Sequence, residues 1–151
     1  MDTKNKLNVL VERRFNASPE RVFDAWLDPA LIGRWMFGPA VHDEEISRLT
    51  VDARVGGSFS FVVRRQGEEI NHVGRYLHMN RPRRLVFTWG IAGVSEDQSR
   101  VIVDVLPAGT GCELTLQHEL QPQWADYAAR MEAGWTAMLD ALAATLDERQ
   151  A

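Results

Sequence analysis

The chain has 151 residues, 45% of them hydrophobic and 25% charged, and its 17 Lys and Arg against 21 Asp and Glu give a formal net charge of −4. This length suits one domain spanning residues 1–151, and the composition excludes disorder, collagen and coiled coil as descriptions of the whole chain. The acidic balance argues against a nucleic-acid-binding protein, because such proteins neutralise phosphates with basic side chains.

Cysteine content and apolar run lengths indicate where the protein works. Cys112 is the one cysteine in the sequence, so no internal disulfide can form. The opening residues, MDTKNKLNVL, do not resemble a signal peptide, and no apolar run approaches the roughly 20 residues of a membrane span. We therefore expect a cytoplasmic protein without a membrane span. The histidines, at positions 42, 72, 78 and 118, lack the spacing of metal ligands, and we expect no metal or cofactor.

The first quarter of the sequence predicts one strand and two short helices. Apolar and polar residues alternate over residues 7–15, which is typical of a half-buried strand. Ser18 followed by Pro19 is the signature of a helix N-terminus. The pair Asp28-Pro29 ends this helix and begins a second one, which stops at Gly38-Pro39.

The middle of the sequence predicts a series of strands separated by turns. Paired glycines at 56 and 57 indicate a bulge or a close backbone approach, and turns are expected at residues 66–68 and 107–111. The expected strands cover residues 44–52, 55–63, 70–79, 85–89, 101–105 and 114–118.

The last segment predicts one long amphipathic helix. Its apolar stripe consists of Trp124, Tyr127, Ala128, Met131, Trp135, Met138, Leu139, Leu142 and Leu146. Gly134 within it would let another backbone or a ligand approach closely. We therefore expect an α+β fold, in which a curved antiparallel sheet wraps around the helix and leaves room for a cavity between them.

Several local patterns resemble the family related to the C-terminal domain of the activator of the Hsp90 ATPase. That family belongs to the START-like, or Bet v 1-like, helix-grip superfamily (SRPBCC). The matching segments occur in the family's order and span nearly the whole chain: RRFNASP at 13–19, VFDAW at 22–26, DP at 28–29, RW at 34–35, GP at 38–39, DARVGGSF at 52–59, GRY at 74–76, PRRLVFTW at 82–89, LTLQH at 114–118, and GW at 134–135 with Leu139. The resemblance implies a helix-grip fold, with about six to seven strands around the C-terminal helix.

The resemblance also places the apolar strand faces and the helix stripe around one interior. The residues expected to line a ligand-binding cavity there are Phe59, Phe61, Tyr76, Phe87, Trp89, Val103, Leu116, His118, Met131, Trp135 and Met138. The alternative for each apolar residue is that it simply fills the core, since protein interiors pack densely.

Two polar residues fall on apolar faces. His118 shares a face with Leu114 and Leu116, where it would act as a general acid or base, anchor a ligand by a hydrogen bond, or serve as a satisfied core histidine. Arg13 would hold a ligand carboxylate, pair with an Asp or Glu, or extend to the strand's end.

Further residues receive smaller roles. Tyr76 and Trp124 would gate the cavity mouth, and His72 shares the parity of Tyr76. Asp52 and Arg54 are expected to form an ordinary surface pair. Cys112 is expected to be a buried, inert thiol.

Three functions follow, all compatible with a monomer or a homodimer. The first is binding of a small hydrophobic molecule, lipid-like or polyketide-like, in the cavity. The second is an enzyme resembling polyketide cyclases or hydratases, with His118 as its acid or base. The third is a stress-response domain that interacts with a chaperone of the Hsp90 type, which predicts an exposed patch rather than a deep cavity.

Overall fold

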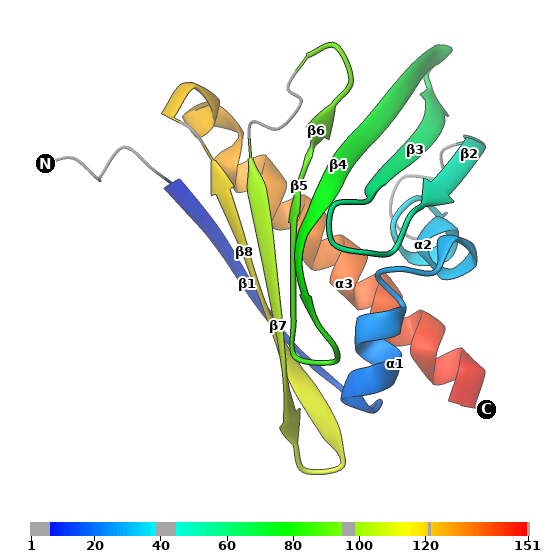
Figure 1. Cartoon of the computed structure of the whole chain (residues 1–151), viewed down its shortest axis with the longest axis vertical. Helices are drawn as coiled ribbons and strands as arrows, with labels where there is room; N and C mark the ends of the chain where they lie inside the picture. Colours follow the sequence, from blue (N-terminus) through cyan, green and yellow to red (C-terminus); the bar gives the residue numbers. More distant parts are fainter. Residues whose placement is uncertain (1–6, 39–44, 95–98, 121, 151) are drawn as a thin grey trace, which may run out of the picture.

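A computed structural model describes residues 7–38, 45–94, 99–120 and 122–150 of the chain. The fold is α+β: a curved antiparallel sheet, two short helices after the first strand, and one long C-terminal helix (Figure 1). The elements are β1 Leu7–Phe15, α1 Pro19–Asp24, α2 Pro29–Trp35, β2 Glu45–Val51, β3 Ser58–Arg65, β4 Glu68–Asn80, β5 Arg84–Thr88, β6 Gly90–Ile91, β7 Arg100–Ala108, β8 Gly111–Leu120, the 3-10 segment η2 Pro122–Tyr127, and α3 Ala128–Gln150. The expected helix-grip architecture is confirmed.

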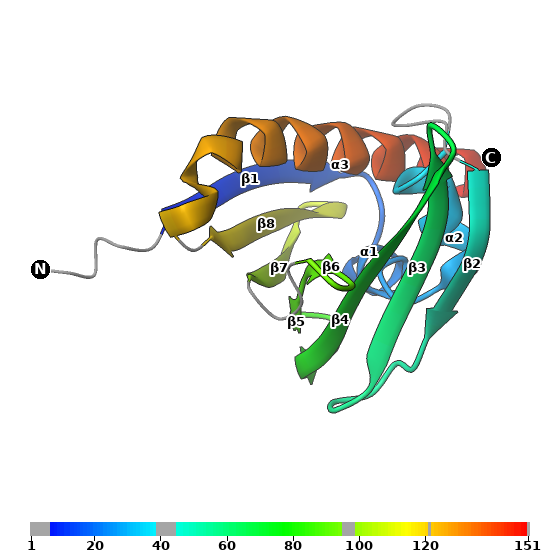
Figure 2. The same cartoon turned by 90° about the horizontal axis from the view of Figure 1, so that it is seen from above.

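The sheet forms an arc that α3 closes. Its strands run in the order β1-β8-β7-β5-β4-β3-β2, and the short β6 pairs with β4. Seen from above, α3 lies along β1 at one side of the arc and contacts α2 toward the other side (Figure 2). The concave face of the sheet and the apolar face of α3 therefore point into one interior.

The helices α1 and α2 begin at the caps that the sequence predicts. The Ser18 hydroxyl accepts a hydrogen bond from the Arg21 amide at 3.2 Å, and the Asp28 carboxylate accepts one from the Ala30 amide at 3.0 Å. Such caps satisfy backbone N–H groups that the first helical turn leaves unpaired.

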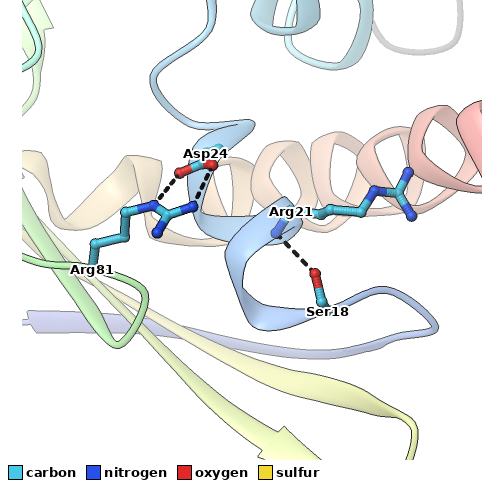
Figure 3. A network of polar contacts seen from close by, with 4 residues as sticks. All are labelled: Ser18, Arg21, Asp24 and Arg81. Atoms are coloured by element: carbon cyan, nitrogen blue, oxygen red, sulfur yellow. Dashed lines mark hydrogen bonds and ion pairs between the residues drawn. The ribbon is translucent and has the colours of Figure 1, made fainter.

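Side-chain contacts fasten α1 to its surroundings. Arg81, at the turn between β4 and β5, donates two hydrogen bonds of 2.8 Å to the two carboxylate oxygens of Asp24 (Figure 3). Arg21 extends toward α3 and donates a bond of 2.8 Å to the Leu146 carbonyl. These contacts thus hold α1 to the turn between β4 and β5 and to α3.

Most predicted strands are confirmed, with shifted ends. The glycine pair lies before β3 rather than inside it, since Gly56 takes a φ of 88° and a Cβ on Gly57 would meet the Asp52 carbonyl at 2.2 Å. The strand β7 extends to Ala108, so the turn predicted over residues 107–111 is confined to residues 109–110. The two-residue β6 was not predicted. The C-terminal helix begins at Ala128 instead of Trp124, because residues 122–127 form a 3-10 segment.

Candidate functional site

A cavity of about 430 Å³ lies at one end of the interior, between the N-terminal part of α3 and the strands near β6. The described residues that line it are Arg65, His72, Trp89, Gly90, Ile91, Val94, Ser99, Leu120, Tyr127, Arg130, Met131, Gly134, Trp135 and Met138. Its volume is roughly three times that of the 150 Å³ apolar cavity known to take up benzene. It also falls in the range of about 300–1,000 Å³ that is typical of small-molecule sites.

Gly134 contributes open space to this cavity. A Cβ built on this residue would meet only the Met138 methyl group, at 3.9 Å, which is ordinary contact. Glycine inside a helix costs roughly 0.5–1 kcal/mol relative to alanine. The missing side chain therefore enlarges the cavity at some expense of helix stability.

Aromatic and thioether side chains form the cavity's inner wall. Trp89 and Trp135 face each other with ring centres 5.4 Å apart, and Met131 and Met138 lie beside them along α3. His72 is 8% exposed and stacks on Trp89 with ring centres 5.4 Å apart and planes at 19°. This wall offers a large polarizable contact area for an apolar molecule.

A chain of hydrogen bonds behind this wall joins α3 to the sheet. The Trp135 indole N–H donates to His118 Nδ1 at 3.0 Å, and His118 Nε2 lies 2.8 Å from the Ser99 hydroxyl. The Ser99 hydroxyl donates in turn to the Trp89 carbonyl at 2.6 Å. This series of hydrogen bonds begins at Trp135 and ends at Trp89, the two tryptophans that line the cavity.

These hydrogen bonds also determine the tautomer and the charge of His118. An indole N–H can only donate, so Nδ1 must be an acceptor and the ring proton resides on Nε2, which donates to Ser99. The side chain is fully buried, and burial lowers the pKa of His118 to about 4. His118 is therefore a neutral residue that holds Trp135 and Ser99 in place.

The other end of the interior is filled with aromatic rings. Phe59 stacks on Phe61 with ring centres 4.6 Å apart, and it also contacts Tyr76 and Phe87 at 5.6 and 5.7 Å. The void that these rings enclose together with Trp26, Met36 and Trp89 measures about 10 Å³. This is no more than the space of a single water molecule.

The structure thus divides the residues that the sequence placed around one cavity. Trp89, Met131, Trp135 and Met138 line the large cavity. The others do not: Phe59, Phe61, Tyr76 and Phe87 line the small void, and Val103, Leu116 and His118 are buried in the sheet.

The position predicted for Tyr76 at the cavity mouth is wrong. Its side chain is 2% exposed and packs in the aromatic cluster, and burial raises the pKa of its phenol. Alternation along β4 holds up to this residue, since His72, Gly74 and Tyr76 are all buried, so Tyr76 points into the interior rather than toward the mouth. Trp124 was the second predicted gate, and its side chain lies outside the described part of the structure.

Three other predictions concern residues away from the cavity. Arg13 forms an ion pair with an acidic residue, one of its predicted roles, because its Nε lies 3.1 Å from an Asp140 carboxylate oxygen on α3. Asp52 and Arg54 form the expected surface pair, with oxygen–Nε distances of 3.0 and 2.9 Å. Cys112 is fully buried, and burial raises the pKa of its thiol, as expected of an inert cysteine.

The sequence analysis missed three polar residues that line the cavity: Arg65, Ser99 and Arg130. For Arg130 a signal exists, because Tyr127, Arg130, Gly134 and Met138 follow one another at helical spacing of three and four. Arg65 and Ser99 reach the same site from distant parts of the chain, which only the fold brings together.

Comparison with known proteins identifies the family. Residues 16–147 match the family described as "Activator of Hsp90 ATPase homolog 1-like protein". The chain belongs to this family. A search of curated proteins finds no match.

Solved structures agree on the fold of this family member. A protein from Chromobacterium violaceum is 27% identical, with a TM-score of 0.78 over 91% of this chain and 96% of the other. An AHSA1-like protein from Aeromonas hydrophila is 23% identical, with a TM-score of 0.79 over 95% and 94%. A protein of unknown function from Staphylococcus aureus is 19% identical, with a TM-score of 0.83 over 96% of each chain. The last two show likeness of fold alone.

Among the residues that the structure describes, no helix is both long and apolar enough to span a bilayer. Within the same residues, no three His, Cys, Asp or Glu side chains are grouped closely enough to hold a metal ion.

Proposed function

We propose that this protein binds a small, predominantly apolar molecule, lipid-like or polyketide-like, in the cavity between α3 and the sheet. The observation that carries the proposal is the cavity of about 430 Å³, which lies beside an aromatic cluster whose own void measures only about 10 Å³. Its inner wall of Trp89, Met131, Trp135 and Met138 supplies apolar contact. Membership of a helix-grip family supports the same function, while the site residues remain part of the proposal.

The geometry of His118 argues against its use as a general acid or base. Both ring nitrogens are engaged, one by Trp135 and the other by Ser99, and His118 does not line the cavity. A catalytic base must reach the proton that it removes, directly or through one water. The cyclase-like alternative would therefore need another residue as its base.

The interaction with an Hsp90-type chaperone, which the family's name suggests, remains an alternative prediction. It differs from ligand binding in a simple respect, because it requires a protein partner and no occupied cavity. A pull-down with purified Hsp90 and a measurement of its ATPase rate would test it directly. The cytoplasmic location expected from the sequence also remains a prediction.

Native mass spectrometry of gently purified protein, followed by denaturing extraction, tests the proposed function. We expect a co-purified apolar molecule, or otherwise saturable binding of the neutral probe N-phenyl-1-naphthylamine to the empty protein. A ligand present at 100 times its Kd should stabilise the fold by about 2.7 kcal/mol. At about 2–4 °C per kcal/mol for a chain of this size, the melting temperature should rise by roughly 5–10 °C.

The refuting result is also clear. Protein without a co-purified molecule that neither binds the neutral probe nor gains thermal stability from fatty acids, sterols or aromatic polyketides would overturn the proposal.

A further inference from the structure

Two arginines are among the described residues that line the cavity. Arg65 at the end of β3 and Arg130 on α3 both line it, and no Asp or Glu is found among the described lining residues. The chain as a whole has a formal net charge of −4, so these two arginines contrast with the overall sign of the protein. A cleft lined by one sign of charge concentrates ligands of the opposite sign.

Arg130 is held in a defined place. Its guanidinium carbon lies 5.3 Å from the centre of the Tyr127 ring, and both side chains line the cavity. A guanidinium beside an aromatic ring keeps several N–H donors with which it can bind an anion. Arg130 is exposed on α3, so its charge stays hydrated when the cavity is empty.

The interior behind these arginines is apolar. Met131 follows Arg130 directly, and Gly134 and Trp135 lie about one turn further along α3. Ile91 and Leu120 line the same cavity from the sheet. A ligand that suits both regions has an apolar body and a charged head, with the body inside and the head at the mouth. An anionic head would gain hydrogen bonds from arginine, whereas a cationic head would be repelled.

We infer that the cavity takes an apolar molecule that carries one anionic group, a carboxylate or a sulfonate, which Arg130 and Arg65 bind at the mouth. The inference rests on the proposed function, since it names the class of ligand for the same cavity. An exposed arginine contributes modestly to binding, and we expect its removal to weaken the affinity about three- to tenfold. The contribution should fall as salt is added, because exposed charges are screened.

Two probes with one ring system separate the charge from the apolar body. 1-Anilinonaphthalene-8-sulfonate carries a sulfonate, and N-phenyl-1-naphthylamine is its neutral counterpart. Both are titrated by fluorescence against the wild-type protein, Arg130→Gln, Arg65→Gln and the control Arg48→Gln. Arg48 is exposed on β2 and does not line the cavity, so its variant loses the same charge elsewhere.

We expect Arg130→Gln to weaken binding of the sulfonate probe about three- to tenfold and to change binding of the neutral probe less than twofold. Arg65→Gln should act in the same direction, and Arg48→Gln should leave both affinities unchanged. Raising the salt concentration should weaken the binding of the sulfonate probe and leave the binding of the neutral probe unchanged.

The possible failures are distinguishable. If Arg130→Gln and Arg65→Gln leave the sulfonate probe unaffected while both probes bind, the charge inference is wrong and the proposed function stands. If Arg48→Gln weakens the sulfonate probe as much as Arg130→Gln does, the effect comes from the overall charge and the inference is again wrong. If neither probe binds the empty wild-type protein, the proposed function and the inference fall together.

Discussion

Filling the cavity from Gly134 should separate ligand binding from folding. Gly134→Leu places a side chain where a Cβ meets only the Met138 methyl group at 3.9 Å. A leucine in a helix points back toward the preceding turn, which here holds Arg130 and Met131, two lining residues. The new side chain would therefore occupy the cavity itself.

The size of the effect follows from the four carbon atoms that leucine adds. If each displaces one ligand atom, worth about 0.3 kcal/mol in a drug-sized ligand and up to about 0.8 kcal/mol for a fully buried methylene, the loss is about 1–3 kcal/mol. This corresponds to a roughly 5–150-fold weaker affinity. Gly134→Ala adds one carbon, and its affinity should fall less than about fivefold by the same reasoning.

Stability should change in the opposite direction. Alanine at position 134 removes the backbone cost of a glycine inside a helix, which stabilises the fold by about 0.5–1 kcal/mol. The melting temperature of Gly134→Ala should then rise by roughly 1–4 °C.

Titration with N-phenyl-1-naphthylamine and urea unfolding measure the two effects on the same samples. Ala133→Leu is the matched control, because Ala133 is exposed on the same helix and does not line the cavity. A folded Gly134→Leu variant that binds the probe as tightly as the wild type would refute the reasoning on the site. Lower stability of Gly134→Ala would refute the description of open space beside this residue.

Three other substitutions test the interior. In the folded protein, the pKa of His118 is lowered to about 4, whereas an unfolded histidine has a pKa near 6.5. Between these two pH values the unfolded chain binds a proton at this residue and the folded protein does not. Stability should therefore decline from pH 6.5 to 4, at up to about 1.4 kcal/mol per pH unit. Urea unfolding of His118→Gln should lack this part of the pH dependence, whereas the control His78→Gln, at an exposed histidine, should keep it. Equal slopes of stability against pH in the wild type and both variants would contradict the low pKa of His118. Trp135→Phe keeps a ring but leaves His118 Nδ1 without its donor, and denaturant unfolding should show a loss of about 1–3 kcal/mol; an unchanged midpoint would show that this bond is worth little. Gly74→Ala should destabilise the fold by about 1–3 kcal/mol or more, because a Cβ there would lie 2.0 Å from the Thr88 carbonyl oxygen; a variant as stable as the wild type would disprove that close approach.

The elements were predictable where local signals agree. Alternation over residues 7–15, and the caps at Ser18 and Asp28, act within a few residues. The strand β1 matches its predicted bounds, and α1 and α2 begin where they were predicted but end earlier, at Asp24 and Trp35. The resemblance then supplied the long-range arrangement of strands around α3, which no local pattern contains.

The candidate site was predictable only in part. Apolar spacing places Phe59 and Trp135 in the interior but does not say whether the space beside them is filled. That depends on how rings from different elements meet: Phe59 stacks on Phe61 and closes its end, whereas Gly134 leaves space beside Trp135. Arg65 and Arg130 are far apart in sequence and become neighbours of one mouth only through the fold.

The two ends of α3 are held unequally, and this has a consequence for motion. Its C-terminal half is anchored by fully or nearly fully buried Leu139, Leu142 and Leu146, and by the bond from Arg21 to the Leu146 carbonyl. Its N-terminal turns border the cavity and have fewer buried contacts. Local opening costs least where buried contacts are few.

We therefore expect amide hydrogens of residues 129–133 to exchange with solvent faster than those of residues 139–146. A ligand could then enter and leave through transient opening of the first turns of α3 while the aromatic end of the interior stays intact. The first turns of α3 would then determine how fast a ligand binds and dissociates, and the C-terminal half of the same helix would determine how long the protein stays folded.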